Sequence, residues 1–326
     1  MSKMEKEKKV RTMPIGMGIL VFIVGFVGGV VSKFAITPSW SKNYSVEWSD
    51  EIGMLKTDIS YHDGEANKFD LYLPKDNTKE NYGLVVYLHA GGFTSGDKND
   101  DKKTLSWLCS KGYVGINYTL RTETNNASVF TQSNEIKAAI PKVIEVAEQE
   151  GYHINKLAMA GGSAGHTLAM IYAYRDAEES PVPVALTFGG VGPSCFYTED
   201  WDNYGLDRNT EESYQAAAGL FAAMLGRELT VDEIKSGTYI EKMKPISAAA
   251  WITRNSAPAV VAYGAYDRVQ PFKASLRLKK ALEENGIDHK YFEFSHSGHG
   301  LQNDNTMEKQ WMEAIEEYLN KYMPIK

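Results

Sequence analysis

After residue 50, the hydrophobic pattern alternates between two kinds of segment. Short runs that are apolar throughout, such as Leu84–Leu88, are typical of strands covered on both faces of a sheet. Similar runs occur at Tyr113–Tyr118, Leu157–Ala160, Val184–Phe188, Ala259–Tyr263 and Tyr291–Phe294. Two earlier strands are predicted at Ile59–Tyr61 and Phe69–Leu73, around the turn Asp63-Gly64.

Helical patterns lie between these runs. Apolar residues recur at spacings of three and four, which predicts helices with one buried face. They do so at Ile136–Ala147 with Pro141 inside, at Leu278–Leu282 before Gly286, and at Trp311–Tyr322. Strands that alternate with helices predict an α/β fold with a mostly parallel central sheet and helices on both faces.

One long segment interrupts this alternation. About 70 residues separate the strands predicted at 184–188 and 259–263. They contain the aromatic residues Phe196, Tyr197, Trp201 and Tyr204, and then a helical stretch at Ala216–Leu225. An insertion of this length is more often a lid or a binding wall than plain scaffold, so we expect a cap at about 191–257. The alternative is an extra packing helix.

The N-terminus has a different composition. Residues 1–12 hold five basic and two acidic side chains, and the 18 residues from Pro14 to Val31 are apolar or glycine. A basic flank before an apolar stretch is typical of an export signal, and this length is at the lower end for a spanning helix. We expect a basic cytoplasmic flank (1–12), a transmembrane anchor or signal (13–36), a linker (37–50) and one domain (51–326).

The preferred interpretation of residues 13–36 is an uncleaved membrane anchor. It would hold the domain on the extracellular or periplasmic side. The sequence Val30-Val31-Ser32 would pass as a cleavage site, which leaves a secreted protein as the alternative.

Composition and charge exclude several classes of protein. The 326 residues are 43% hydrophobic and 24% charged, as in globular chains with a substantial core. The net charge of −7 argues against a nucleic-acid partner, because phosphate binding needs a basic face. Cys109 and Cys195 have no metal-ligand or redox spacing, so no metal or other cofactor is expected. Cys109 is expected on a buried helix face, and a disulfide between the two cysteines is the weaker alternative.

The strongest chemical motif is Gly161-Gly162-Ser163-Ala164-Gly165, which lies between a predicted strand and an apolar helical run. In this context G-x-S-x-G holds a serine on a sharp turn, clear of the backbone, at the N-terminus of a helix. Gly161 and Gly165 have no Cβ to collide with the neighbouring strand and helix. Ser163 is therefore the candidate nucleophile. The alternative, a phosphate-binding turn, lacks the P-loop lysine.

A second motif, His89-Ala90-Gly91-Gly92-Phe93, directly follows the strand predicted at 84–88. Adjacent glycines let the backbone turn its N–H groups outward, where they can hold a carbonyl oxygen that becomes an oxyanion. We predict an oxyanion hole from the N–H groups of Gly91, Gly92 and Ala164, with an ordinary turn as the alternative. His89 is expected to order this loop by hydrogen bonding.

Two further loops supply an acid and a base. Asp267 lies just past the strand predicted at 259–263, and His299 stands between two glycines after the last strand. Carboxyl ends of parallel strands meet at one edge of a sheet, so Ser163, Asp267 and His299 are expected to form a catalytic triad there. The rival base is His296, and the rival acids are Asp288, Glu293 and Asp304.

Taken together, the chain resembles the α/β-hydrolase fold serine esterases of the hormone-sensitive-lipase-like and acetylxylan-esterase-like (BD-FAE-like) group. The resemblance runs from about Ser45 to the C-terminus. Its carriers are His89–Phe93, Ser95-Gly96-Asp97-Lys98, Asn117-Tyr118, the turn at Ser163, and the loops of Asp267 and His299. Ala90 stands where the family usually has glycine. Gly162 stands where the lipase-like branch often has aspartate, which favours the carbohydrate-ester branch.

The resemblance implies an α/β-hydrolase fold and a serine hydrolase of carboxylic esters with a short, acetyl-type acyl group. The expected partners are a small-molecule ester substrate and, through the N-terminal helix, a membrane. Amide or peptide hydrolysis is the first alternative, because the same triad cleaves amides. A binding protein without catalysis is the second, although such a protein would typically have lost the serine or the histidine.

Overall fold

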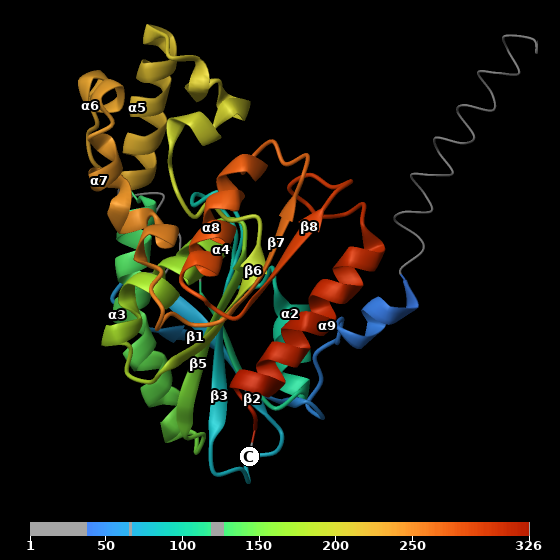
Figure 1. The fold of residues 1–326 in the computed structure, drawn as a ribbon. Helices are drawn as coiled ribbons and strands as arrows, with labels where there is room; N and C mark the ends of the chain where they lie inside the picture. Colours follow the sequence, from blue (N-terminus) through green and yellow to red (C-terminus); the bar gives the residue numbers. More distant parts are fainter. Residues whose placement is uncertain (1–37, 65–66, 119–126, 326) are drawn as a thin grey trace, which may run out of the picture. The chain divides into compact units, whose positions relative to one another are not determined.

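The structure of the chain, a computed structural model, describes residues 38–64, 67–118 and 127–325 (Figure 1). The chain divides into two units between Asn43 and Tyr44. The described part of the first unit contains the short 3₁₀-helix η1 (Ser39–Asn43). The flank and the anchor or signal predicted for residues 1–36 lie outside the described residues. Among the helices that the structure describes, none is long and apolar enough to cross a bilayer.

The second unit, residues 44–326, is built on one sheet of eight strands. They are β1 (Gly53–Ser60), β2 (Lys68–Pro74), β3 (Tyr82–Leu88), β4 (Val114–Tyr118), β5 (Ile154–Gly162), β6 (Val184–Gly190), β7 (Ala259–Gly264) and β8 (His289–Phe294). Their order in the sheet is β1-β2-β4-β3-β5-β6-β7-β8. Only the pairs β1–β2 and β2–β4 are antiparallel, and all the others are parallel. The predicted α/β fold with a mostly parallel sheet is confirmed.

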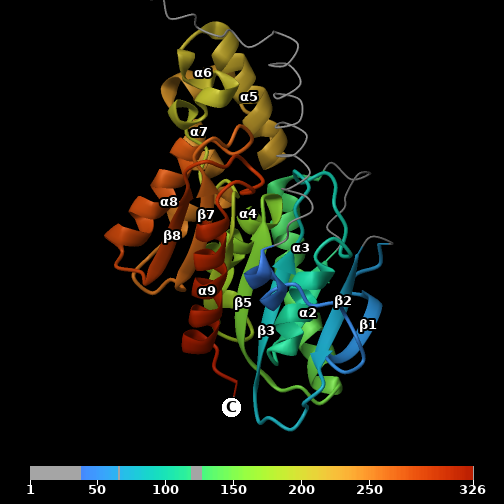
Figure 2. The same ribbon diagram turned by 90° about the vertical axis from the view of Figure 1, so that its right-hand side faces the viewer.

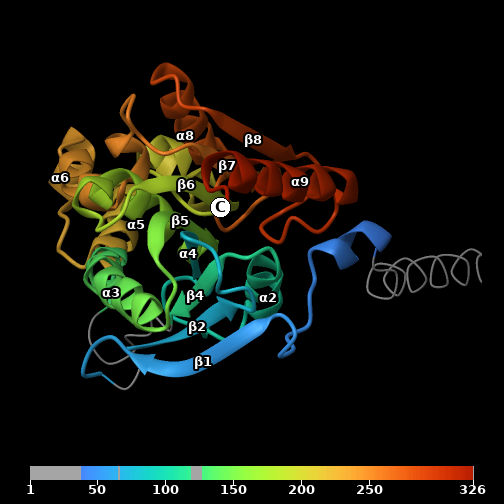
Figure 3. The ribbon, with the colours of Figure 1, turned by 90° about the horizontal axis from the view of Figure 1, so that it is seen from below.

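Helices cover both faces of this sheet. They are α2 (Lys102–Ser110), α3 (Val129–Gln149), α4 (Ala164–Ile171), α8 (Phe272–Glu284) and α9 (Asn305–Tyr322). Helices α3, α4 and α8 lie on one face, and α2 and α9 lie on the other (Figures 1 and 3). Each face of the sheet has its own hydrophobic core, because successive side chains of a strand point to opposite faces. Leu84 and Val86 of β3 pack with side chains of α3 and α4, whereas Val85 packs with side chains of α2 and α9.

The strand at the edge of the sheet is longer than its sequence predicted. β1 begins at Gly53 and ends at Ser60, whereas the apolar pattern had placed the strand at Ile59–Tyr61. Its side chains do not alternate regularly, because the pairing shifts between Lys56 and Ile59, where Asp58 has a φ of 57°. A bulge of this kind breaks the two-residue period on which the sequence interpretation relied.

Residues 191–257, which we call the cap, join β6 to β7. Its helices are α5 (Glu211–Leu225), α6 (Val231–Ser236) and α7 (Tyr239–Met243), with short 3₁₀ turns η4 (Thr198–Asp200), η5 (Asp202–Tyr204), η6 (Leu206–Arg208), η7 (Lys244–Ile246) and η8 (Ala248–Trp251). Capping boxes at Thr210 and Thr230 begin α5 and α6. Helices α5 to α7 gather beyond the carboxyl ends of the parallel strands (Figures 1 and 2). That end of the sheet is where the loops after β3, β5, β7 and β8 also lie.

Candidate active site

Ser163 stands on the sharp turn between β5 and α4. It is the N-cap of α4, with φ 51° and ψ −118°, a backbone conformation that residues other than glycine rarely adopt. Its N–H donates to the carbonyl oxygen of Gly190 at 2.9 Å, which fixes the strained turn to the end of β6. The partial positive charge of the helix N-terminus lies beneath the serine, where negative charge would develop on an attacked carbonyl.

The glycines around this serine are required by close backbone contacts. A Cβ on Gly165 would lie 1.9 Å from the carbonyl oxygen of Leu88, and a Cβ on Gly161 would lie 2.5 Å from the same atom. Contacts under 3.0 Å with backbone do not occur in real side chains. The turn therefore packs directly against the end of β3, and it places Ser163 beside the loop that follows that strand.

His299 reaches Ser163 from the loop after β8. Its Nε2 lies 2.8 Å from the Oγ of Ser163, although the two residues are 136 positions apart in the chain. The His299 side chain is 27% exposed, so the imidazole is open on one side to solvent or to a substrate. Serine and imidazole are within the distance that proton transfer requires.

Asp267 completes the line of hydrogen bonds. Its Oδ2 lies 2.7 Å from the Nδ1 of His299, and the carboxylate side chain is only 1% exposed. Its other oxygen, Oδ1, accepts from the N–H groups of Val269 (2.8 Å) and Gln270 (2.9 Å). The buried carboxylate is fixed by these contacts, and it orients the His299 ring with Nδ1 toward Asp267 and Nε2 toward Ser163.

The rival candidates from the sequence lie elsewhere. His296 has a 77% exposed side chain, and its Nδ1 lies 2.7 Å from Asp304 Oδ1. The same Asp304 accepts from the hydroxyl of Ser297 at 2.6 Å, so these three residues brace the loop that carries His299. Asp288 accepts from the hydroxyl of Tyr318 and from Lys321 on α9. Neither His296 nor Asp288 forms a hydrogen bond to Ser163 or His299.

The loop after β3 carries the predicted oxyanion donors. Gly91 (φ 132°), Gly92 (φ 60°) and Phe93 (φ 67°) are three successive residues with positive φ. The carbonyl oxygen of Gly91 accepts from the N–H groups of Thr94 and Ser95 at 3.1 and 2.9 Å. In a trans peptide the N–H points opposite to the carbonyl, so the N–H of Gly92 is directed away from this inner turn. His89 Nδ1 lies 2.6 Å from the carbonyl oxygen of Ala90 in the same loop, the local contact expected of it.

A buried ion pair ties the end of this loop to the sheet. The ammonium of Lys98 lies 2.6 Å from Asp70 Oδ1 on β2, and the Asp70 side chain is fully buried. Asp58 adds a second carboxylate 3.2 Å from the same ammonium. The run Ser95-Gly96-Asp97-Lys98 contributed to the family resemblance, and one structural role of its lysine is this anchor.

His166, one turn into α4, is a residue that sequence reasoning did not single out. Its ring is fully buried, and its Nδ1 accepts from the N–H of Gly192 at 3.3 Å. Burial lowers the pKa of His166 to about 3, so the ring is neutral and can accept this bond. The Gly192 carbonyl in turn accepts from the buried hydroxyl of Tyr263 at 2.8 Å. His166 thus fixes the start of the cap to the helix that bears the serine.

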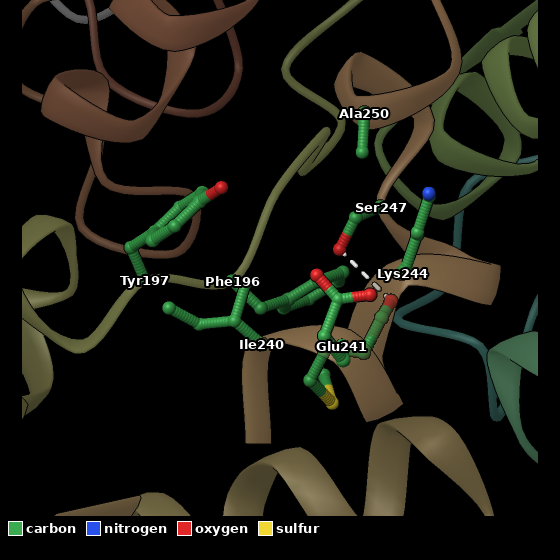
Figure 4. A pocket seen from close by; sticks show the side chains of 8 residues that line it. Phe196, Tyr197, Ile240, Glu241, Lys244, Ser247 and Ala250 are labelled. Atoms are coloured by element: carbon green, nitrogen blue, oxygen red, sulfur yellow. Dashed lines mark hydrogen bonds between the residues drawn. The ribbon is translucent and has the colours of Figure 1, made fainter. Parts of the chain in front are cut away.

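A surface pocket of about 180 Å³ opens within the cap. Its lining includes Phe196 and Glu241, and Figure 4 shows Tyr197 on one side of the view and Lys244 and Ser247 on the other. A second pocket of about 200 Å³ shares Tyr197 and Ser247 and extends to α8. Ser163, Asp267 and His299 line neither pocket. Neither pocket is therefore assigned as the place where the reacting part of a substrate binds.

In the part of the chain that the structure describes, the cysteine, acidic and histidine side chains are the candidates for a disulfide or a metal site. Cys109 and Cys195 are free and buried, which contradicts the weaker alternative of a disulfide between them. Burial raises the pKa of each thiol to about 12, which keeps both protonated. Within residues 38–64, 67–118 and 127–325, no group of three His, Cys, Asp or Glu side chains could hold a metal ion.

Comparison with known proteins agrees with this architecture. The BD-FAE family model matches residues 69–282, well over half of the 326 residues. This match runs from β2 to α8 and contains Ser163 and Asp267, whereas His299 lies beyond its end. None of the curated proteins matches the chain in sequence.

Solved structures with a similar fold include three esterases. A thermophilic esterase from Thermogutta terrifontis, with butyrate bound, has a TM-score of 0.66 and 20% identity over 84% of this chain and 96% of its own. Esterase B from Lactobacillus rhamnosis has a TM-score of 0.61 and 16% identity over 94% and 96%. A truncated carbohydrate esterase from gut microbiota has a TM-score of 0.62 and 17% identity over 83% and 98%. At these identities the likeness establishes the fold.

Proposed function

Because the chain belongs to the BD-FAE family, a family of esterases with the α/β-hydrolase fold, it is a carboxylic ester hydrolase, and we propose that Ser163, His299 and Asp267 are its catalytic triad. The observation that carries this proposal is the line of hydrogen bonds from Asp267 through His299 to Ser163, at 2.7 and 2.8 Å. It lies at the carboxyl edge of the parallel strands, where such sheets form their sites.

In the first half of the reaction, the Oγ of Ser163 attacks the ester carbonyl carbon while Nε2 of His299 takes the hydroxyl proton. The buried carboxylate of Asp267 stabilises the imidazolium that forms and keeps the ring oriented. His299 then returns the proton to the leaving alcohol, and the acyl group remains on Ser163. Water, activated by His299 in the same way, hydrolyses this acyl-enzyme and regenerates the serine.

The tetrahedral intermediate carries a negative oxygen that needs hydrogen-bond donors. We assign this role to the N–H groups of Gly91, Gly92 and Ala164. Two features support the assignment: the Gly92 N–H is directed away from its own turn, and Ala164 is the first residue of α4. Donors that are already fixed in place cost no reorganisation at the moment of reaction, which makes them effective catalysts.

For the substrate we propose an ester with a short, acetyl-type acyl group, with carbohydrate esters preferred to lipid esters. Gly162 and the run Ser95–Lys98 favour this branch in the sequence. Two fold relatives fit the proposal: the Thermogutta enzyme was solved with butyrate, a short acid, and another relative is a carbohydrate esterase.

For the location of the enzyme we propose an N-terminal membrane anchor at residues 13–36 with the hydrolase unit outside the cytoplasm. The support is the basic flank followed by 18 apolar or glycine residues. A full-length protein that sediments with membranes and keeps its N-terminus would agree with this. A mature chain that begins near Lys33 would instead indicate a cleaved signal and a secreted enzyme.

The triad is tested by substitution and by labelling. Ser163→Ala and His299→Ala should each lower kcat by a factor on the order of 10³–10⁶ with the fold intact. His296→Ala is the matched control, and it should keep most of the activity because His296 contacts Asp304. A fluorophosphonate probe should label Ser163 alone. Activity that survives Ser163→Ala would refute the proposed triad.

The substrate is tested with two series of esters. Hydrolysis of p-nitrophenyl esters should be fastest for acetate and should fall as the acyl chain lengthens. Acetylated oligosaccharides should release acetate with a higher kcat/KM than short-chain glycerides. A preference for long acyl chains would overturn the acetyl-type assignment and leave the triad untouched.

A further inference from the structure

The cap makes two side-chain hydrogen bonds to the loop that carries Asp267 (residues 265–271, the acid loop). The Nδ2 of Asn203 donates to the carbonyl oxygen of Asp267 itself at 2.7 Å. The hydroxyl of Tyr204 donates to the carbonyl oxygen of Val269 at 2.9 Å. Both donors come from η5, which lies far from the acid loop in sequence, so the cap contacts the backbone of the proposed acid directly.

The acid loop has little packing of its own on the solvent side. Tyr266 is 70% exposed and Val269 is 52% exposed, and both flank Asp267 in the chain. From inside, the loop is held by the bonds from Val269 and Gln270 to the Asp267 carboxylate. The N–H groups of Ala265 and Tyr266 also donate to carbonyl oxygens at and just after the end of β8, each at 3.0 Å. On the cap side, the carbonyl oxygens of Asp267 and Val269 accept from Asn203 and Tyr204.

The cap segment that supplies these donors is itself firmly attached. Helix α8 begins one residue after the acid loop, and Arg277 on this helix binds Asp200 and, at 2.8 Å, Glu199. Lys273 of α8 donates to the carbonyl oxygen of Glu199 at 2.6 Å. Residues 199–204 therefore hold the acid loop and the first turns of the helix that follows it.

The other side of the same segment is buried. Trp201 is 1% exposed and stacks on Phe196 at 5.6 Å between ring centroids, with Phe221 of α5 edge-on at 5.6 Å. Large buried aromatic rings leave little freedom to the backbone that bears them. Asn203 and Tyr204, which follow two and three residues later, thus project from a rigid base.

We propose that Asn203 and Tyr204 are positioning residues for the triad, and that they hold the acid loop so that Asp267 keeps its hydrogen bond to His299. This inference rests on the proposed function, since it matters only if Asp267 and His299 act in catalysis. It gives the cap a role in the chemistry itself, in addition to any contact with substrate. A small displacement of one catalytic group can lower the rate about 100-fold, which makes such a brace effective.

The test removes each donor and keeps the size of the side chain. Asn203→Leu and Tyr204→Phe should each lower kcat several-fold, and the double variant should lower it by about 10–100-fold. KM and the preference among acyl chain lengths should stay within about twofold. We expect a downfield proton NMR signal from the His299 Nδ1–H that faces Asp267. This signal should disappear in Asp267→Asn and should weaken or broaden in the double variant.

Two matched controls come from the same cap. Lys235→Met removes an exposed ion pair to Glu211, and Tyr214→Phe removes a hydroxyl on α5; both should leave kcat and the NMR signal unchanged. Tyr204→Phe is mild enough to keep the fold, which circular dichroism and the melting temperature verify.

Three results would overturn the proposal. One is an unchanged kcat in the double variant. The second is a raised KM with kcat intact, which would make this segment a binding wall only. The third is a lowered melting temperature with kcat and the NMR signal intact, which would make its role purely structural. Ser163→Ala belongs in the same assay. If it loses activity while the double variant keeps its kcat, the positioning proposal fails and the proposed triad does not, so the two failures can be told apart.

Discussion

At position 165, in the turn after Ser163, the packing leaves room only for glycine. Any Cβ there would meet the backbone of Leu88 and of His89, at 1.9 and 2.7 Å from their carbonyl oxygens. Neither atom can move without shifting β3 and the loop with the proposed oxyanion donors. The motif G-x-S-x-G was visible in the sequence, but the atoms that make its last glycine obligatory are visible only in the fold.

We predict that Gly165→Ala destabilises the protein by at least about 3 kcal/mol and abolishes ester hydrolysis. Denaturant unfolding and an esterase assay measure the two effects. Gly219→Ala is the matched control, because a Cβ on Gly219 meets nothing within 4 Å in α5. It should stabilise the chain by about 0.5–1 kcal/mol. Wild-type stability in Gly165→Ala would contradict the packing argument.

His166 makes stability depend on pH. Its pKa is about 3 in the folded chain because of burial, against about 6.5 in an unfolded chain. Between these values the unfolded state binds a proton that the folded state does not. Stability is therefore lost as pH falls below about 6.5, by up to about 1.4 kcal/mol per pH unit.

We predict that His166→Asn removes this part of the pH dependence, since the amide oxygen can still accept from Gly192. Between pH 7 and pH 5, the free energy of unfolding of the wild type should fall by about 2 kcal/mol more than that of the variant. Urea unfolding at the two pH values measures the difference. His153→Asn, at an exposed position, should behave as the wild type does. Equal slopes in His166→Asn and the wild type would contradict the assigned cause.

Among the secondary-structure elements, strands and helices with a regular period were the most predictable. The apolar runs at β3 to β8 and the spacing of three and four in α3, α8 and α9 were confirmed. The length and the bulge of the edge strand β1 were not predicted, and neither was the π-helical turn at Tyr172–Asp176. Tertiary pairing and helix packing set these features, and no repeating pattern in the sequence marks them. The helical stretch at 216–225 was predicted correctly and is the second half of α5.

The loop between β3 and α2 depends on its ion pair to β2. We predict that Lys98→Met destabilises the chain by about 3–5 kcal/mol, because it leaves the buried carboxylate of Asp70 without its cation. Since this lysine ends the loop that bears Gly91 and Gly92, kcat should fall as well. Denaturant unfolding and ester hydrolysis measure both effects.

A double variant and a control make the ion-pair prediction specific. Lys98→Met combined with Asp70→Leu should be less destabilised than Lys98→Met alone, since no buried unpaired charge remains and Asp58 is exposed to water. Lys103→Met removes an exposed pair to Glu47 and should change stability little. If Lys98→Met unfolds at the wild-type denaturant concentration, the pair does not anchor the loop.

The larger of the two units begins at Tyr44. Tyr44 packs edge-on against Trp107 of α2, and Trp48 packs against Tyr72 of β2, with ring centroids 5.3 and 5.2 Å apart. We predict that residues 44–326 alone fold and hydrolyse esters with the kcat of the full chain. Starting the chain at residue 50 removes both aromatic contacts and should cost about 2–4 kcal/mol of stability. An inactive 44–326 chain would show that the first unit is needed for folding or catalysis.

Much of the candidate site was predictable because each member follows a recognisable strand. Ser163, Asp267 and His299 come after β5, β7 and β8, and parallel pairing brings the ends of these strands to one edge. The residues that hold these three side chains and their loops in place were not predictable. Asn203, Asp304 and His166 lie in no motif, and their roles depend on which loop lies within hydrogen-bond reach once the chain has folded.

The parallel pairing from β5 to β8 also has a consequence for the time course of refolding. Ser163 and His299 are 136 residues apart in the chain. The cap residues lie between β6 and β7, so the chain must close this long loop before β7 can pair with β6 and β8 can pair with β7. Contacts between residues far apart in sequence form late, because the chain loses conformational entropy on closing the long loop before the new contacts can compensate for that loss. On dilution from denaturant, far-UV circular dichroism should therefore recover first and ester hydrolysis last. Enzymatic activity in this chain then reports the final step of assembly.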